Sequence, residues 1–184
     1  MLLARHRLTV EHYHRMAEAG ILPPGQRTEL IDGEIIDMAP IGTRHAALVR
    51  KLGRVLELQA GNAYTVSVQN PLRLSDQSEP EPDLVLLTYR ADSYEHAHPT
   101  PADVKLLIEV ADTTLRYDTQ IKLPLYARHG VSEVWVFDLE AHRLHRWRQP
   151  QGDAYTLLDS LDHGSAMTLA AAPGLTLDLS SLAL

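Results

Sequence analysis

The chain has 184 residues, a formal net charge of −7 and no cysteine. This length suits a single domain, expected here over residues 1–184. The absence of cysteine excludes disulfides, thiolate zinc sites and cysteine nucleophiles, and the acidic balance argues against a dedicated high-affinity binder of duplex nucleic acid. The first residues lack an apolar segment of signal-peptide length, so we expect a cytoplasmic protein without a membrane span.

The N-terminal part predicts a short helix followed by a hairpin. Thr9 can cap a helix that closes on Gly20, with apolar residues at helical spacing between them. Residues 29–38 read as two short strands around Asp32 and Gly33, a pair typical of tight turns. Residues 1–40 are therefore expected to form an extension that precedes the main fold.

The rest of the chain predicts alternating helices and strands. Helices are expected at residues 43–60, ending before Gly61, and at residues 117–129, ending before Gly130. Strands are expected at residues 64–74, 84–88, 105–110, 133–138 and 143–148. From about residue 150 a strand-rich tail follows, interrupted at residues 170–174. This order indicates an α/β fold with a central mixed β-sheet flanked by helices.

Two carboxylates lie at the ends of apolar strands. Asp83 precedes Leu84–Leu87, and Glu109 interrupts Leu106–Val110. If these strands are adjacent and antiparallel, both side chains emerge at the same edge of the sheet. A buried carboxylate needs a cationic partner, which a divalent ion or Lys122 could supply. One or two carboxylates with water are the usual environment of magnesium.

Ordinary explanations of the same residues stay open. Asp118 and Lys122 are four residues apart and could form a surface pair on a helix. Glu109 could pair with an arginine in a purely structural role. Asp83 could simply end a turn.

Three further features have two interpretations each. Glu34 is a candidate third carboxylate or a solvated residue after the turn, and His45 either approaches the site or packs at the start of its helix. The segment His142–Arg148 could contact phosphates and stack a base, or form a charged edge strand that discourages aggregation. No metalloprotease, serine-hydrolase, Walker or dinucleotide-binding motif is present in the sequence.

Several of these segments resemble the Uma-type family, restriction-endonuclease-like domains of the PD-(D/E)xK nuclease superfamily. The resemblance covers about residues 29–148, and its motifs are Glu29–Glu34, His45, Pro82-Asp83, Ile108–Val110, Asp118–Lys122 and Tyr126–Val136. It implies a restriction-endonuclease-like core and hydrolysis of phosphodiester bonds, with DNA as a possible substrate.

The resemblance also implies roles for particular residues. Asp83 and Glu109 would hold Mg²⁺ or Mn²⁺, Lys122 would assist the attacking water, and Glu34 and His45 would lie at the periphery of the catalytic site. The lysine of the superfamily normally sits two residues after the glutamate. That position here is Ala111, so the role passes to Lys122.

Two further points bear on the helix after Glu109 and on the function. Pro124 lies two residues after Lys122 and would delay or kink the expected helix. The rival function is a catalytically silent scaffold that forms a homodimer through exposed strands such as residues 144–148 or through the C-terminal tail, which the acidic balance favours. A hydrolase of sugars or nucleotides that uses paired carboxylates without metal would leave Lys122 without a task.

Overall fold

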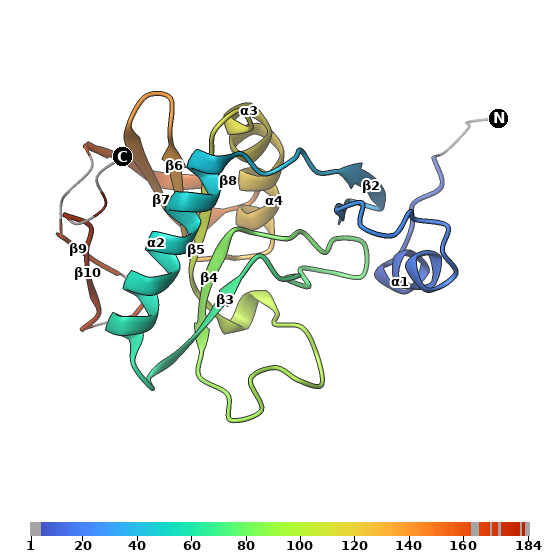
Figure 1. Ribbon diagram of the computed structural model, residues 1–184, viewed down its shortest axis with the longest axis horizontal. Helices are drawn as coiled ribbons and strands as arrows, with labels where there is room; N and C mark the ends of the chain where they lie inside the picture. The colour runs from blue at the N-terminus through green and yellow to red at the C-terminus, as the bar shows by residue number, and fades with distance from the viewer. Residues whose placement is uncertain (1–4, 163–165, 170, 173, 181, 183–184) are drawn as a thin grey trace.

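The centre of the protein is a mixed sheet of six strands (Figure 1). The computed structural model describes residues 5–162, 166–169, 171–172, 174–180 and 182. The strands lie side by side in chain order: β3 (Tyr64–Val68), β4 (Leu84–Thr88), β5 (Val104–Ala111), β6 (Glu133–Asp138), β7 (Arg143–Gln151) and β8 (Ala154–Asp162). β5 and β6 run parallel, and the other neighbouring pairs are antiparallel.

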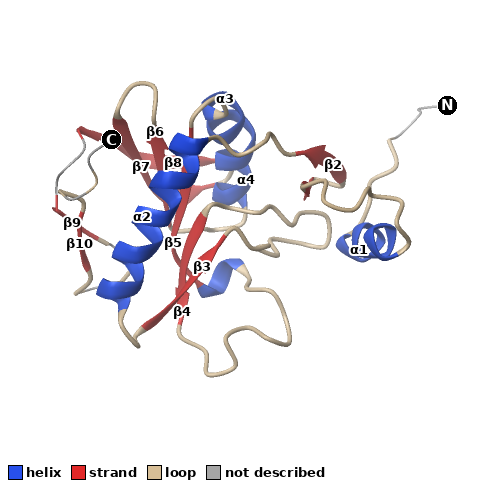
Figure 2. Ribbon diagram, in the orientation of Figure 1, coloured by secondary structure: helices blue, strands red, loops and turns tan. Residues whose placement is uncertain are grey.

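Helices cover both faces of this sheet (Figure 2). α2 (Thr43–Ala60) packs on one face, and the segments α3 (Leu115–Tyr117), η2 (Asp118–Lys122) and α4 (Leu123–Arg128) lie along the other. Alternate residues of each strand pack on opposite faces of the sheet, because successive side chains of a strand point in opposite directions. Leu84 and Leu86 pack under α2, whereas Val85 and Leu87 join the core of α4. The predicted fold class is confirmed.

The parallel pair has a consequence for the position of the helical segments. Parallel neighbours need a crossover, and α3, η2 and α4 supply it between β5 and β6. The crossover leaves β5 at its carboxyl end, where side chains of open α/β sheets commonly form sites. Glu109 has the same strand parity as Leu107 and Ala111, so its side chain enters the face that the crossover covers.

The N-terminal extension contains the predicted helix and hairpin. α1 (Val10–Glu18) starts after Thr9, whose hydroxyl accepts the His12 N–H at 3.2 Å. β1 (Thr28–Ile31) and β2 (Glu34–Asp37) pair antiparallel. In Figure 1 this extension lies to one side of the sheet. Leu30 exchanges backbone hydrogen bonds with Glu79, which attaches the hairpin to the loop before β4.

The C-terminal part covers the α2 face. β9 (Ala166–Thr168) and β10 (Thr176–Asp178) form a small antiparallel pair, and Met167 and Leu177 pack in the same core as α2. Of the interruption predicted at residues 170–174, Ala170 and Pro173 lie outside the described residues. A short 3₁₀ helix, η1 (Pro101–Asp103), precedes β5. Over the part of the chain that the structure describes, no helix combines the length and apolarity needed to cross a membrane.

Two expectations about the elements were wrong, and the irregularity expected in the helix near Pro124 is confirmed. The strand predicted at residues 64–74 ends at Val68, because Gln69 adopts a positive φ of 50° and leaves the extended conformation. The helix predicted at residues 117–129 is divided by the π-helical turn η2, which opens the backbone just before Pro124, where a regular α-helix would clash with the proline ring. β7 lies between β6 and β8, so residues 144–148 are not an exposed edge strand.

Candidate active site

A cavity of about 220 Å³ opens beside the carboxyl end of β5. The hairpin β1–β2, the start of α2 and the segments α3 and η2 form its walls. Seven carboxylates but only two permanently charged cations line it: Glu29, Asp37, Glu81, Asp83, Glu109, Asp112 and Asp118 against Arg27 and Lys122. The cavity is therefore strongly acidic, and an anionic ligand could enter it only with additional positive charge.

Asp83 is fixed by hydrogen bonds from three elements. Its Oδ2 accepts the Val110 N–H at 2.8 Å and lies 3.0 Å from His45 Nε2, and its Oδ1 accepts the Gln69 amide at 3.1 Å. Burial alone would raise the pKa of Asp83, but His45, the Val110 amide and Lys122 together hold its pKa below the ordinary value. Asp83 is therefore an ionised and rigidly oriented carboxylate.

Glu109 lies beside Asp83 and is buried at the wall of the cavity. Its Oε1 accepts the Tyr126 hydroxyl at 2.5 Å and the Lys122 ammonium at 2.8 Å, and its Oε2 accepts the Asp83 N–H at 3.3 Å. Burial raises the pKa of Glu109 to about 8, Lys122 lowers it in part, and the nearby Asp118 and Asp83 raise it again. Glu109 thus carries a proton near neutral pH in the absence of another cation.

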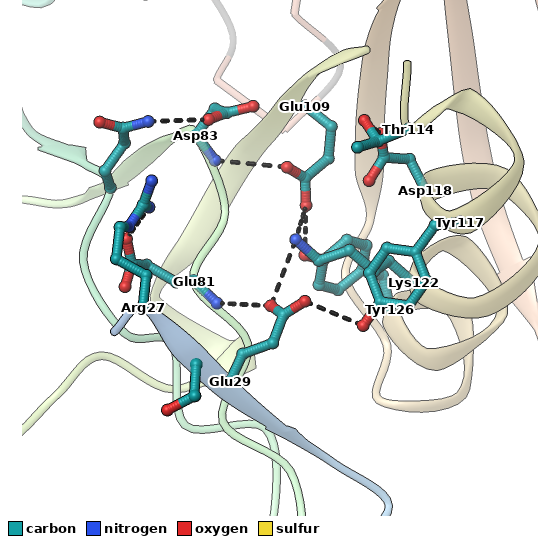
Figure 3. Close-up of polar contacts among 12 residues, drawn as sticks. Arg27, Glu29, Glu81, Asp83, Glu109, Thr114, Tyr117, Asp118, Lys122 and Tyr126 are labelled. Carbon is teal, nitrogen blue, oxygen red and sulfur yellow. Dashed lines mark hydrogen bonds and ion pairs between the residues drawn. The ribbon is translucent and has the colours of Figure 1, made fainter. Parts of the chain in front are cut away.

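Lys122 bridges two carboxylates from distant parts of the chain (Figure 3). Its Nζ lies 2.8 Å from Glu109 Oε1 and 3.4 Å from Glu29 Oε2. Glu29 is oriented in turn by the Tyr117 hydroxyl at 2.9 Å and by the Glu81 N–H at 3.1 Å. Burial alone would lower the pKa of Lys122, but Glu109, the Tyr126 hydroxyl and Glu29 hold its pKa well above the ordinary value.

Asp118 completes the group of buried acids. It accepts the Thr114 hydroxyl at 2.6 Å. Burial raises the pKa of Asp118 to about 6, against the lowering effects of Lys122 and Thr114. The interpretation of Asp118 and Lys122 as an ordinary surface pair is wrong, because both residues are buried.

Together these residues form what we call the carboxylate cluster: Glu29, Asp83, Glu109 and Asp118 around the single ammonium of Lys122. Four acids facing one ammonium leave an excess of negative charge, which adds to burial in raising the pKa values of Glu109 and Asp118 and raises the pKa of Lys122 against its burial. A divalent cation would relieve this excess, and carboxylate oxygens are the ligands that Mg²⁺ and Mn²⁺ prefer.

The carboxylate oxygens of the cluster therefore fit a divalent ion, but the protein supplies only part of the ligands that such an ion needs. Over the described residues, no group of three or more His, Cys, Asp or Glu side chains is arranged to hold a metal. A site built on Asp83 and Glu109 would consequently rely on water and substrate oxygens for its remaining ligands, as is usual for Mg²⁺.

The comparison with known families agrees with this architecture. The sequence model of Uma2, described as "Putative restriction endonuclease", matches residues 10–180. The chain belongs to the Uma2 family. The predicted resemblance to the Uma-type family is thereby confirmed.

A solved structure supports the fold of this Uma2 chain. A crystal structure described as a "putative nuclease belonging to DUF820" from Anabaena variabilis superposes with a TM-score of 0.74 and 17% sequence identity, over 95% of this chain and 97% of that chain. No curated protein matches the chain. The solved structure therefore shows the same fold, and the family model gives the family.

The structure of this Uma2 chain brings together four of the five predicted site residues. Asp83, Glu109, Lys122 and His45 line one cavity. Glu34 does not belong to it, because its carboxylate pairs with Arg5 and Arg7 at 3.2 and 2.7 Å. The side chain of Glu34 is 45% exposed, as a solvated residue after the turn would be.

An arginine partner for Glu109 is contradicted, and phosphate contacts by the basic segment His142–Arg148 stay a prediction. Lysine, not arginine, is the cation that Glu109 meets. The basic residues of the segment are engaged by the neighbouring strand, since Arg146 and Arg148 both pair with Asp159 at 2.6 Å. The segment therefore does not offer these two guanidinium groups to a phosphate.

Sequence analysis missed four polar residues of the Uma2 site. Glu29, Tyr117, Tyr126 and Gln69 hold the cluster together by hydrogen bonds. One signal was available for Glu29, which opens a predicted strand directly before the apolar pair Leu30-Ile31 and is buried in the structure. The two tyrosines gave no such signal, because their direction depends on the unpredicted turn η2.

Proposed function

We propose that this Uma2 protein is a metal-dependent nuclease that hydrolyses phosphodiester bonds of DNA, with Mg²⁺ or Mn²⁺ bound by Asp83 and Glu109. The observation that carries the proposal is that Glu109 contacts both the backbone N–H of Asp83 and the ammonium of Lys122, inside an acidic cavity that the Asp83 carboxylate also lines. Membership of a family described as restriction endonucleases supports the same reaction class.

The ion, when bound, would polarise a phosphoryl oxygen and lower the pKa of a coordinated water. The protein contributes orientation and charge. His45, Gln69 and the Val110 N–H hold the Asp83 carboxylate ionised in one direction. Such preorganised groups stabilise developing charge without reorganising during the reaction.

Lys122 supplies the positive charge of the protein at the reacting centre. Glu29 is its second partner at 3.4 Å, so Lys122 stays protonated even when Glu109 turns toward another cation. Its ammonium can then donate a hydrogen bond to the attacking water or to a phosphate oxygen, where negative charge grows. Tyr126 and Tyr117 hold the two carboxylates between which this ammonium lies.

The test is cleavage of single-stranded and duplex DNA with Mg²⁺ or Mn²⁺. Asp83→Asn, Glu109→Gln and Lys122→Met should each lower the rate by roughly a hundredfold or more, the usual loss on removing one preorganised group. Glu34→Gln is the matched control, because Glu34 is a carboxylate outside the cavity, and it should cleave as the wild type does. Unchanged rates in all three site variants would refute the proposal.

One observation favours a second candidate, the catalytically silent scaffold. Lys122 is only 4% exposed and already satisfied by two carboxylates, which is also what a structural ion pair requires. Titration calorimetry separates the two functions. Mg²⁺ binding that disappears in Glu109→Gln supports the nuclease, and the absence of any Mg²⁺ binding supports the scaffold.

The assembly and cellular location stay predictions. A homodimer is expected to show twice the mass of the chain in light scattering, although its proposed strand 144–148 is internal to the sheet. A cytoplasmic location is tested by cell fractionation.

A further inference from the structure

A second concave surface lies directly beside the acidic cavity. It is a groove of about 500 Å³ between α2 and the edge strand β3, and we call it the α2–β3 groove. Ile41 lines both the cavity and the groove. Gln69 lines the groove and donates its side-chain amide to Asp83 at 3.1 Å. The two depressions therefore share Ile41 as a lining residue, and Gln69 links the groove to Asp83 in the cavity.

Two arginines of α2 line this groove. Arg50 and Arg54 are both exposed, and among the described residues neither guanidinium has a hydrogen bond or ion pair with the protein. Most other arginines of the described residues are engaged, such as Arg128 with Asp32 and Arg146 with Asp159. In a protein with a net charge of −7, two adjacent unpaired guanidinium groups in a concave surface indicate an anionic ligand.

The spacing of the two arginines suits a chain of phosphates. They are one helical turn apart on the same side of α2, which corresponds to about 6 Å along the axis. Successive phosphates of a nucleic-acid strand are separated by a similar distance. Guanidinium groups bind phosphate oxygens through paired hydrogen bonds. The direction is also defined, because Ala46 lies near the cavity end of α2 and Glu57 lines the groove at the other end, where its carboxylate would repel a phosphate.

Gln69 connects this groove to the reacting centre. Its backbone has a positive φ of 50°, a left-handed conformation that is strained for a residue other than glycine. The same residue holds Asp83 twice, through its side-chain amide at 3.1 Å and through its backbone N–H on the Asp83 carbonyl at 3.0 Å. The wall of the groove thus also positions the candidate metal ligand.

We propose that the α2–β3 groove binds the phosphodiester backbone of a nucleic-acid strand, with Arg50 and Arg54 on successive phosphates next to the one held in the acidic cavity. This inference rests on the proposed nuclease function and adds the path of its substrate. It also explains how an acidic protein could bind a polyanion: the positive charge is concentrated on one short track that leads to the cavity.

The experiment measures binding, separately from cleavage. The full chain is titrated into short labelled single-stranded DNA and RNA of the same sequence, in EDTA so that metal-dependent hydrolysis is absent, and fluorescence anisotropy is followed over a range of salt concentrations. The double variant Arg50→Gln and Arg54→Gln is compared with a control, Arg15→Gln and Arg73→Gln. The control removes the same two charges from exposed positions outside the groove.

The groove variant should bind at least roughly tenfold more weakly at low salt, and the slope of log affinity against log salt should fall by about 1.4, since each lost phosphate contact on a single strand contributes about 0.7. The control should bind as the wild type does. Equal loss on DNA and RNA supports contacts to the shared backbone, and loss on one of them alone identifies that nucleic acid as the ligand.

Three results would overturn the inference: wild-type affinity in the groove variant, an equal loss in the control, or no binding of either nucleic acid by the wild type. Circular dichroism checks that the variants remain folded, which is expected because glutamine is a good helix former. Failure of the groove is distinguishable from failure of the nuclease. Salt-dependent groove binding without metal-dependent cleavage would refute only the proposed function, and cleavage that is insensitive to the groove variant would refute only the groove.

Discussion

Replacing Glu109 by glutamine should remove most of the pH dependence of stability above pH 6. The pKa of Glu109 is raised to about 8 from an ordinary 4.5 because the residue is buried among other acids. Between these two values the folded protein binds a proton that the unfolded chain releases, so stability is fully present below about pH 4.5 and is lost as the pH rises through 8. The pKa of Asp83 is shifted in the opposite direction, below its ordinary value, so its contribution to stability is lost only at acidic pH.

The size of the loss of stability follows from the shift in the pKa of Glu109. One pKa unit corresponds to about 1.4 kcal/mol, so a shift from 4.5 to about 8 gives at most about 5 kcal/mol, with a slope that approaches about 1.4 kcal/mol per pH unit near neutrality. Asp118, with a pKa of about 6, adds a decline in the more acidic range. The steep part above pH 6 therefore belongs to Glu109.

Urea unfolding from pH 5 to 9 in EDTA measures this directly, with the buried Trp135 as the fluorescent reporter. The wild type should lose stability steadily above pH 6, and Glu109→Gln should give a much flatter profile. Glu79→Gln is the matched control, because Glu79 is a buried glutamate outside the carboxylate cluster, and it should keep the slope of the wild type. Parallel profiles for the wild type and Glu109→Gln would refute the reasoning.

Three further changes test the same cluster. Tyr126→Phe removes the hydroxyl that lies 2.5 Å from Glu109. At pH 7, where Glu109 is protonated, the change should lower the free energy of unfolding by about 1 kcal/mol, the usual value of a hydrogen bond between neutral groups. No change in urea unfolding at this pH would contradict it. Lys122→Met leaves Glu109 and Glu29 buried without their cation. It should lower the free energy of unfolding by about 3–5 kcal/mol at pH 8 and by less at pH 5, where Glu109 is protonated. An equal loss of stability at both pH values would argue against the proton on Glu109. Mg²⁺ binding should release close to one proton at pH 7 and almost none well above pH 8, since Glu109 must lose its proton to bind a metal. Calorimetry in buffers of different ionisation enthalpy measures the number of protons released. A proton release that does not vary with pH would contradict the prediction.

Much of the fold could be predicted from local patterns. The apolar stripe of residues 43–60 corresponds to α2, and the apolar runs around Asp83 and Glu109 correspond to β4 and β5. These elements have clear periodicity because each buries one face or stripe against the other layer. The two carboxylates could be expected to meet because antiparallel neighbours place the start of one strand beside the end of the other, as the register of Leu84 with Ile108 shows.

The rest of the site depends on contacts that no local pattern contains. Glu29 and Glu34 lie on the two strands of one hairpin, and the sequence does not show which of them points toward Lys122. Packing decides it: Glu29 is buried under the crossover, whereas Glu34 reaches the N-terminal arginines. Gln69 could not be predicted either, because its role depends on a left-handed backbone at a residue other than glycine.

The π-helical turn η2 determines which side of the crossover faces the acids. Tyr117 and Tyr126 are nine residues apart, and at 3.6 residues per turn a regular α-helix would direct them about 180° apart. The wider turn absorbs roughly one residue and reduces this angle to about 80°, so that one hydroxyl reaches Glu29 and the other reaches Glu109. A deletion of one residue within η2 would leave the two tyrosines eight residues apart and keep the angle of about 80° in a regular helix. A regular helix over all nine residues would lose the alignment, so the cluster depends on how η2 (Asp118–Lys122) matches the number of residues between the tyrosines.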